Sequence, residues 1–227
     1  MPTPGLVAMK RVPLWFKVIY TIWVAVWLVL YAGYYPTAHF LWMCHVGNII
    51  LVAAFWLESP LLFSWQAVAL LLADLLWTFD LLTRITIGIH PLGATAYLFV
   101  EQLPIGLRLA SMFHLAMPWI LIWSLWRYGY DRRAIWLQLA TCWILFPLSY
   151  LFGSEADDIN WVFGPFNRVQ HVLPPLLFLF VAMILYPIVV FLPSHLAFTA
   201  IVPRPEGRNR PSPDDSHQSD AQMSVNM

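Results

Sequence analysis

The feature that most constrains this chain is a succession of apolar stretches, each about 20 residues long, with short polar connections between them. A helix of about 20 residues crosses the hydrocarbon core of a bilayer, because it rises about 1.5 Å per residue. Hydrophobic residues make up 60% of the chain and charged residues only 11%. A water-soluble fold of this length could not bury so much apolar surface. The sequence therefore predicts an all-α, polytopic membrane helix bundle.

About six stretches meet the length requirement for a transmembrane helix. They cover residues 14–33, 38–57, 60–81, 107–128, 133–152 and 172–192. Glu58, Ser59 and Pro60 form a hairpin between the second and third stretches, with the proline at a first helical position that tolerates a missing N–H. The Gly- and Pro-rich connection 82–106 is predicted to lie at the interface or to fold back over the bundle.

The ends of the chain differ in composition from the predicted six-helix domain, residues 14–198. Residues 1–13 carry basic residues ahead of the first apolar run. That run is too long, and too rich in tryptophan, for a cleaved signal peptide, so we expect an uncleaved first helix. Residues 199–227 turn to Pro, Ser, Asp, Asn and Gln, which predicts a disordered tail.

The basic residues predict the orientation, because Lys and Arg near span ends favour the cytoplasm. With a cytoplasmic N-terminus, only Arg84, Arg108 and Arg168 fall outside. All the other basic residues near span ends then fall inside: Lys10, Arg11, Lys17, Arg127, Arg132, Arg133, Arg204, Arg208 and Arg210. The sequence thus predicts a multi-pass protein of the cell membrane with both termini cytoplasmic.

Charge and cysteine usage exclude several classes of partner. The chain has 12 Lys plus Arg and 12 Asp plus Glu, so the net charge favours neither nucleic acid nor an acidic partner. Cys44 and Cys142 lie inside apolar stretches and belong to no CxxC or similar spacing, which argues against a disulfide framework. We expect membrane lipid as a partner, and the sequence leaves protein partners open.

Polar residues from separate predicted helices fall at one depth. Cys44, His45 and Asn48 lie roughly 9 to 15 Å below the outer end of the second span, at the rise of an α-helix. Asp74 in the third span and His114 in the fourth lie at a comparable depth. Ionisable groups in hydrocarbon cost about 2.5 to 3.5 kcal/mol each, so this layer indicates either interhelical hydrogen bonds or a functional site.

Three kinds of chemistry could use this layer. Cys44 and His114 could form a nucleophile and its base for attack on an acyl ester. His45, Asp74 and His114 could instead bind a metal ion with a water, although no cofactor is required by the sequence. The same groups could also form a proton or ion pathway, and the spacing does not decide among these.

Short motifs in and around these positions carry a family resemblance. The segment FLWMCHV at 40–46, His114 followed by Pro118, and DINWVFGP at 158–165 resemble the YwaF-type integral membrane proteins and their ether-lipid acyltransferase relatives. The arrangement is also similar to that of the androgen-induced fatty-ester hydrolases, which use a nucleophile in an early helix and a histidine in a later one.

The resemblance implies Cys44 as the nucleophile, His114 as the base and Asn160 at the rim of the site. The hydrolase family uses Thr where this chain has Cys44, so the neighbouring His45 is an alternative to Cys44 as the functional side chain.

The sequence hypothesis is thus an intramembrane lipid acyl hydrolase or acyltransferase, with its site in the outer third of the bilayer. His45, Asn48 and Asp74 would orient or stabilise the reacting groups. The alternative is a non-enzymatic membrane protein, either a small transporter or an accessory subunit whose polar groups lock helix packing.

Overall fold

The computed structural model describes residues 11–205, and within that range every regular element is helical. The longer helices are α1 (Leu14–Ala32), α2 (Met43–Leu57), α3 (Pro60–Ile87), α4 (Ile105–Ser111), α5 (Phe113–Tyr128), α6 (Ala134–Phe152), α7 (Pro175–Tyr186) and α8 (Leu192–Ile201). Short helical turns lie between them: η1 (Thr37–Leu41), η2 (Ala96–Phe99), η3 (Ile159–Trp161), η4 (Pro165–Asn167) and the π turn η5 (Pro187–Phe191). The predicted all-α helix bundle is confirmed.

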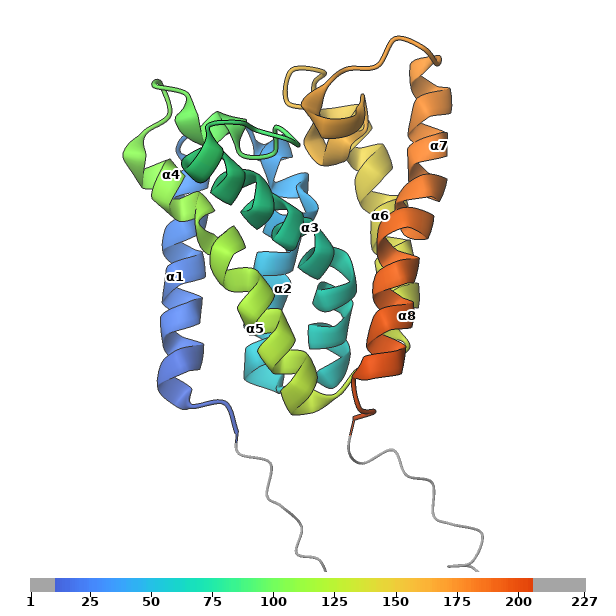
Figure 1. The fold of residues 1–227 in the computed structure, drawn as a ribbon. Coiled ribbons are helices and arrows are strands. Elements are labelled where there is room, and N and C mark those ends of the chain that lie inside the picture. Colours follow the sequence, from blue (N-terminus) through green and yellow to red (C-terminus); the bar gives the residue numbers. More distant parts are fainter. Residues whose placement is uncertain (1–10, 206–227) are drawn as a thin grey trace, which may run out of the picture.

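The helices have the dimensions of a multi-pass membrane protein. In the described part of the chain, 5 helices are long and apolar enough to cross a membrane: Leu14–Ala32, Pro60–Ile87, Ile105–Tyr128, Ala134–Phe152 and Pro175–Ile201. Met43–Leu57 is also apolar but shorter, with 15 residues. Both ends of the described chain lie at the same end of the bundle, drawn at the bottom of Figure 1. The cytoplasmic placement of that end remains a prediction.

The observed helix ends differ from the predicted ones where the backbone turns. The second helix begins at Met43 rather than at 38, because Trp42 has an extended conformation (φ −53°, ψ 131°) that separates η1 from α2. Helix α3 continues to Ile87, where Gly88 adopts a left-handed conformation (φ 80°) and ends it.

The last helical segment also extends beyond its predicted end. It passes through Pro187 as a π turn, which accommodates the missing N–H, and it ends at Ile201. The domain boundary at 198 is therefore three residues early by these bounds. Most of the predicted tail, 206–227, and most of the predicted N-terminal segment, 1–10, lie outside the described residues.

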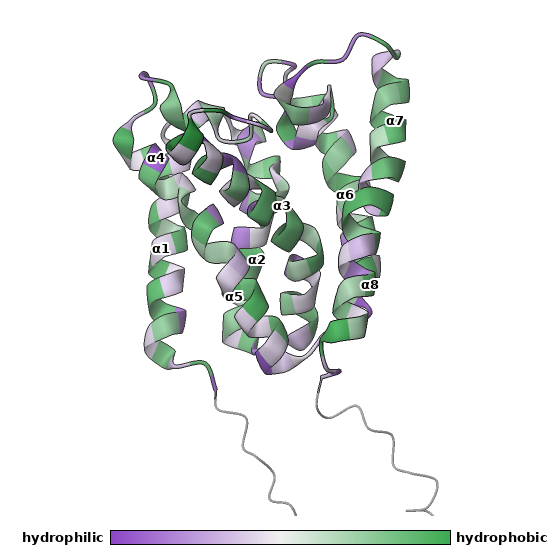
Figure 2. Cartoon of the chain, in the orientation of Figure 1, coloured by the Kyte–Doolittle hydropathy of each residue, from purple (hydrophilic) through white to green (hydrophobic). Residues whose placement is uncertain are grey.

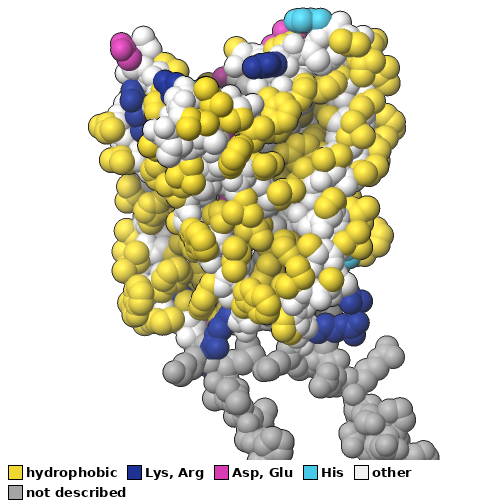
Figure 3. Space-filling model, in the orientation of Figure 1, with side chains coloured by type: hydrophobic (Ala, Val, Ile, Leu, Met, Phe, Trp, Pro, Cys, Tyr) yellow, Lys and Arg dark blue, Asp and Glu magenta, His cyan; other side chains and the backbone are white. Residues whose placement is uncertain are grey.

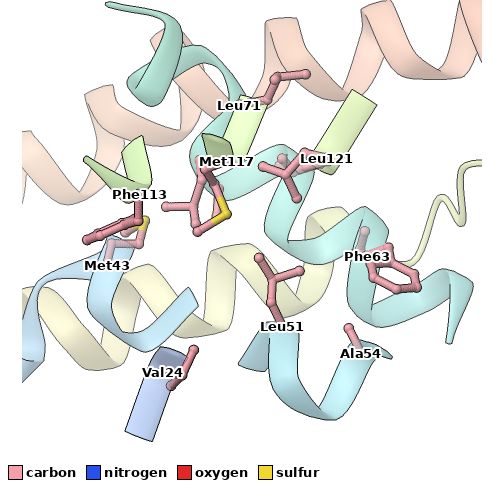
Figure 4. Packing of buried hydrophobic residues seen from close by; sticks show 14 of the residues in the cluster. Val24, Met43, Leu51, Ala54, Phe63, Leu71, Phe113, Met117 and Leu121 are labelled. Atoms are coloured by element: carbon pink, nitrogen blue, oxygen red, sulfur yellow. The ribbon is translucent and has the colours of Figure 1, made fainter. Parts of the chain in front are cut away.

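Helix α3 is the central helix of the bundle and packs against α2, α5 and α6. Figure 4 shows apolar side chains of α1, α2, α3 and α5 in the core that they share. A Cβ at Gly47 would lie 2.4 Å from Leu70 Cδ1, so this glycine lets α2 approach α3 closely.

Hydrophobic and charged side chains are separated along the bundle. Hydrophobic residues cover the helices, whereas hydrophilic residues gather mainly in the connections at the two ends (Figure 2). The space-filling view shows hydrophobic side chains across the middle of one face, with Lys and Arg at both ends (Figure 3). The outward-facing side chains therefore match a hydrocarbon environment.

Candidate functional site

A pocket of about 450 Å³ lies in the half of the bundle away from the chain ends. The start of α2, the middle of α3, α5, the segment 92–97 and the π turn all contribute to its wall. Its lining includes five residues of the sequence hypothesis: Cys44, His45, Asp74, His114 and Asn160. Of the five residues that helix depth placed in one layer, all but Asn48 line this one pocket.

The most specific contact in the pocket joins α3 and α5. Asp74 Oδ1 lies 2.6 Å from Nδ1 of His114, and both side chains are buried. A carboxylate oxygen can only accept, so Nδ1 carries the proton and Nε2 is the nitrogen free for proton transfer. Trp77 stacks on the His114 ring at 4.8 Å between ring centroids, which fixes the plane of the imidazole.

Cys44 lies in the first turn of α2 and faces the same imidazole. Its side chain is only partly buried, lines the same pocket as His114 and interacts electrostatically with the ring. Carboxylate, imidazole and thiol therefore follow one another across three helices. This is the order of groups in a nucleophile activated by an oriented histidine.

Two further polar groups in the pocket have no hydrogen-bond partner among residues 11–205. Asp74 Oδ2 is buried, and no described residue hydrogen-bonds to it. Tyr186, at the end of α7, lines the pocket and interacts electrostatically with both Cys44 and Asp74, yet no described residue hydrogen-bonds to its hydroxyl. A buried polar atom is normally paired, so Asp74 Oδ2 is suited to a bound molecule or to water, and the phenol of the partly buried Tyr186 offers a second polar group to such a molecule.

His45 forms part of the wall of the pocket. Its Nδ1 lies 2.7 Å from the carbonyl oxygen of His39, and its ring packs against Trp27 and Tyr31 with 4.9 Å between centroids in each pair. The Nδ1 proton is therefore donated to the backbone of η1. This hydrogen bond joins the turn η1 to α2 at the residue next to Cys44.

Asn160 holds the start of α2 from the loop 153–174. Its Oδ1 accepts from Met43 N at 2.9 Å, and its Nδ2 donates to the carbonyl oxygen of Leu41 at 2.8 Å and to Ser149 Oγ at 2.9 Å. The first N–H groups of a helix have no partner within the helix, so this side chain caps α2 beside Cys44. Asn160 also lines the pocket, and its role at the rim of a site remains a prediction of the resemblance.

Asn48 differs from the sequence hypothesis in its location. It is absent from the lining of the pocket. Its Oδ1 accepts a hydrogen bond of 2.7 Å from the hydroxyl of Tyr20, so it joins α2 to α1. The depth of Asn48 in the second span could not reveal that its facing neighbour is Tyr20.

The alternative metal site is not assembled. Among residues 11–205, no group of three or more His, Cys, Asp or Glu side chains is positioned to hold a metal ion. Asp74 and His114, two of the suggested ligands, bond to each other, while His45 donates to a backbone carbonyl. The donor set of this pocket therefore fits acid–base chemistry better than metal binding.

The end of the pocket nearest the connections is more polar. His39 Nε2 lies 3.0 Å from Asp157 Oδ1, and Tyr35 stacks on the His39 ring at 4.5 Å. A hydrogen bond from Ser154, together with His39, lowers the pKa of Asp157. Its neighbour Asp158 behaves oppositely, because burial raises its pKa to about 6.

Sequence reasoning missed Tyr186 and Trp77. Both types of residue are typical of the membrane interface, so a tyrosine or tryptophan near a span end carries no signal of its own. The one available signal was Pro187, since a proline inside an apolar helix often marks an irregular turn at a functional site.

Comparison with family models, with curated proteins and with solved structures finds no match for this chain.

Proposed function

We propose that this chain is an intramembrane acyl hydrolase or acyltransferase acting on acyl esters of membrane lipids. The observation that carries the proposal is the Asp74–His114 pair, 2.6 Å between Oδ1 and Nδ1, with the Cys44 thiol beside the same ring in a pocket. In isolation a thiol at neutral pH is mostly protonated, and an oriented imidazole supplies the base that it needs.

The reaction proceeds in two transfers. His114 Nε2 takes the thiol proton while Cys44 Sγ attacks the ester carbonyl carbon, and Asp74 stabilises the imidazolium that forms. The tetrahedral intermediate then expels the alkoxide, which receives the proton from His114, and a thioester remains on Cys44. Water or a second alcohol attacks that thioester in the same way, giving a free acid or a new ester and restoring the thiol.

Tyr186 supplies a hydrogen-bond donor for the negative oxygen of the intermediate. Its phenol lines the pocket, and its electrostatic partners are Cys142, Cys44 and Asp74. The Tyr31 hydroxyl is already 2.8 Å from Ser111 Oγ. A donor aimed at developing charge in a water-poor site contributes more than it would in water.

The short motifs at 40–46 and 158–165 support the same class of reaction, since the families that they resemble act on fatty esters and ether lipids. With the N-terminus in the cytoplasm, the pocket opens toward the outer leaflet of the cell membrane.

The test is ester hydrolysis by the purified full chain in phosphatidylcholine vesicles. Wild type is expected to release p-nitrophenol from a p-nitrophenyl acyl ester, and Cys44→Ala to lose at least about 10³-fold in rate. Cys142→Ala is the matched control, because Cys142 is fully buried outside the pocket. Equal rates in the wild type and Cys44→Ala would contradict the proposal.

A second candidate is a non-enzymatic membrane protein. It is favoured by the fact that other polar residues of the same helices, such as Asn48, serve only to join helices. Such a protein would bind a lipid in the pocket without forming a covalent bond, so it would give no rate above that of Cys44→Ala in the assay above.

A further inference from the structure

The pocket has a side wall that faces the lipid. Leu76 lines the pocket and is also 43% exposed on the outer surface of α3. Leu72 lies one turn away on the same wall, and Val190 of the π turn lines the opposite side. A residue that both lines the pocket and is exposed marks an edge of an opening, so the pocket reaches the outer surface beside Leu76.

The course of the helices explains the opening. Helix α3 packs against η5 and α8 but makes little contact with α7. In Figure 1, α3 leans away from α7 toward the end of the bundle that carries the pocket. The π turn at Pro187–Phe191 is the level at which the two segments part. We name this opening the side slot and define it by Leu72, Leu76, Tyr186 and Val190.

The two ends of the pocket differ in chemistry. The side slot is bordered by aliphatic side chains together with the phenol of Tyr186. The end under the connections carries the His39–Asp157 pair, at 3.0 Å, and Trp161. Cys44, Asp74 and His114 line the same pocket as the residues of both ends. A molecule that fits this gradient has an apolar chain, an ester and a polar end.

We infer that the substrate enters sideways from the bilayer through the side slot, and that the slot is an acyl-chain subsite. The substrate class is then a long-chain acyl ester dissolved in the membrane, with its chain between Leu76 and Val190. Its polar end lies near His39 and Asp157. This inference rests on the proposed function, and it adds the route of entry and the part of the substrate that is recognised.

The test compares two esters with the same reacting group. The full chain in phosphatidylcholine vesicles is given p-nitrophenyl palmitate, which partitions into the bilayer, or p-nitrophenyl acetate, which is dissolved in water. Leu76→Trp and Val190→Trp fill the side slot and are expected to lower kcat/KM for palmitate about tenfold or more. The acetate ester needs no chain subsite, so its kcat/KM is expected to change less than about twofold.

The chain offers closely matched controls. Leu75 is 44% exposed beside Leu76, and Val189 is 62% exposed beside Val190, but neither lines the pocket. Leu75→Trp and Val189→Trp are expected to leave kcat/KM unchanged for both esters. If the slot variants and the controls behave alike, or if acetate and palmitate fall together, the side slot is not the entrance.

A second measurement tests lipid entry through the side slot independently of hydrolysis. It applies even if neither ester is hydrolysed, although that result would reject the proposed function. A palmitate analogue with a diazirine on its chain is crosslinked to the wild type in the same vesicles. Peptides containing Leu72, Leu76 or Val190 are expected to carry the adduct, and Leu76→Trp to lose at least half of it. Adducts confined to other outer faces of the bundle would overturn the inference.

Discussion

Asp74 and Asp80 lie on the same helix, yet their surroundings differ completely. Asp80 Oδ1 accepts from Leu92 N at 2.8 Å and from Gly93 N at 3.1 Å, and its Oδ2 accepts from the Thr95 hydroxyl at 2.6 Å. Asp74 has one partner, His114, and a second oxygen that no described residue contacts by a hydrogen bond. One carboxylate fixes a loop, and the other faces a pocket.

The comparison gives a way to separate structural from functional polar residues in a membrane helix. A buried carboxylate that is saturated by backbone N–H groups stabilises the fold, because its desolvation is offset locally. A buried carboxylate with an unpaired oxygen beside an imidazole and a thiol keeps part of its bonding capacity for another molecule. The predictions below test that contrast.

Asp74→Asn should have the largest effect on the reaction. An amide can present its NH₂ to Nδ1 and favour the wrong tautomer of His114, so the rate of ester hydrolysis is expected to fall about 10² to 10⁴-fold. Unfolding in detergent, followed by tryptophan fluorescence, should change little. A variant with wild-type kcat would show that Asp74 does not orient the base.

Tyr186→Phe should slow acyl transfer about 10²-fold, because it removes the donor to the developing oxyanion. Alkylation of Cys44 by iodoacetamide forms no oxyanion, so the alkylation rate should stay unchanged. Tyr150→Phe, outside the pocket, is the control. Parallel losses of acylation and alkylation in Tyr186→Phe would indicate a damaged pocket instead.

Asp80→Asn should act in the opposite way to Asp74→Asn. It weakens charge-assisted bonds to the backbone of residues 92–95 and is expected to cost about 2 kcal/mol of unfolding free energy. The kcat of the folded fraction should remain within about twofold of the wild type. Chemical denaturation in mixed micelles measures the first quantity, and the assay with p-nitrophenyl acetate measures the second. A specific loss of kcat would remove the contrast between the two carboxylates.

Asp158→Asn should give the smallest effect, and one that depends on pH. Burial raises the pKa of Asp158 from 3.8 to about 6, so the folded state holds this proton more tightly than the unfolded state does. The contribution to stability is therefore greatest below pH 4 and is lost as pH rises to about 6.

The wild type should thus lose about 1 to 2 kcal/mol from this group between pH 4 and pH 7. Asp158→Asn should lack that part of the pH dependence while keeping the bond from Phe163 N, 2.8 Å in the wild type. Thermal unfolding of both proteins at the two pH values measures the difference. Identical pH dependence in the two proteins would exclude Asp158 as its source.

Much of the fold followed from the sequence, because the spanning length and apolar composition of each helix are local properties. The hairpin at Pro60 was predicted from another local property, the tolerance of a first helical position for proline, and it is observed. The break at Trp42 and the π turn at Pro187 were not foreseen, since both depend on how the chain packs around the pocket.

The sequence predicted the depth of the site residues in the bilayer but not their contacts. Helical rise placed Cys44, Asp74 and His114 in one layer, and all three line the pocket. Which polar groups pair with which was not predictable, as Asn48 illustrates by bonding to Tyr20. Contacts across helices depend on helix rotation, which the spacing along one helix does not determine.

The most direct test of the account is the intact mass of the protein after brief exposure to p-nitrophenyl palmitate in vesicles. The account requires the wild type and Cys142→Ala to gain one palmitoyl group, bound to Cys44 and released by neutral hydroxylamine as a thioester is. An adduct that persists in Cys44→Ala, or its complete absence from a wild type that still hydrolyses the ester, would contradict the thiol mechanism.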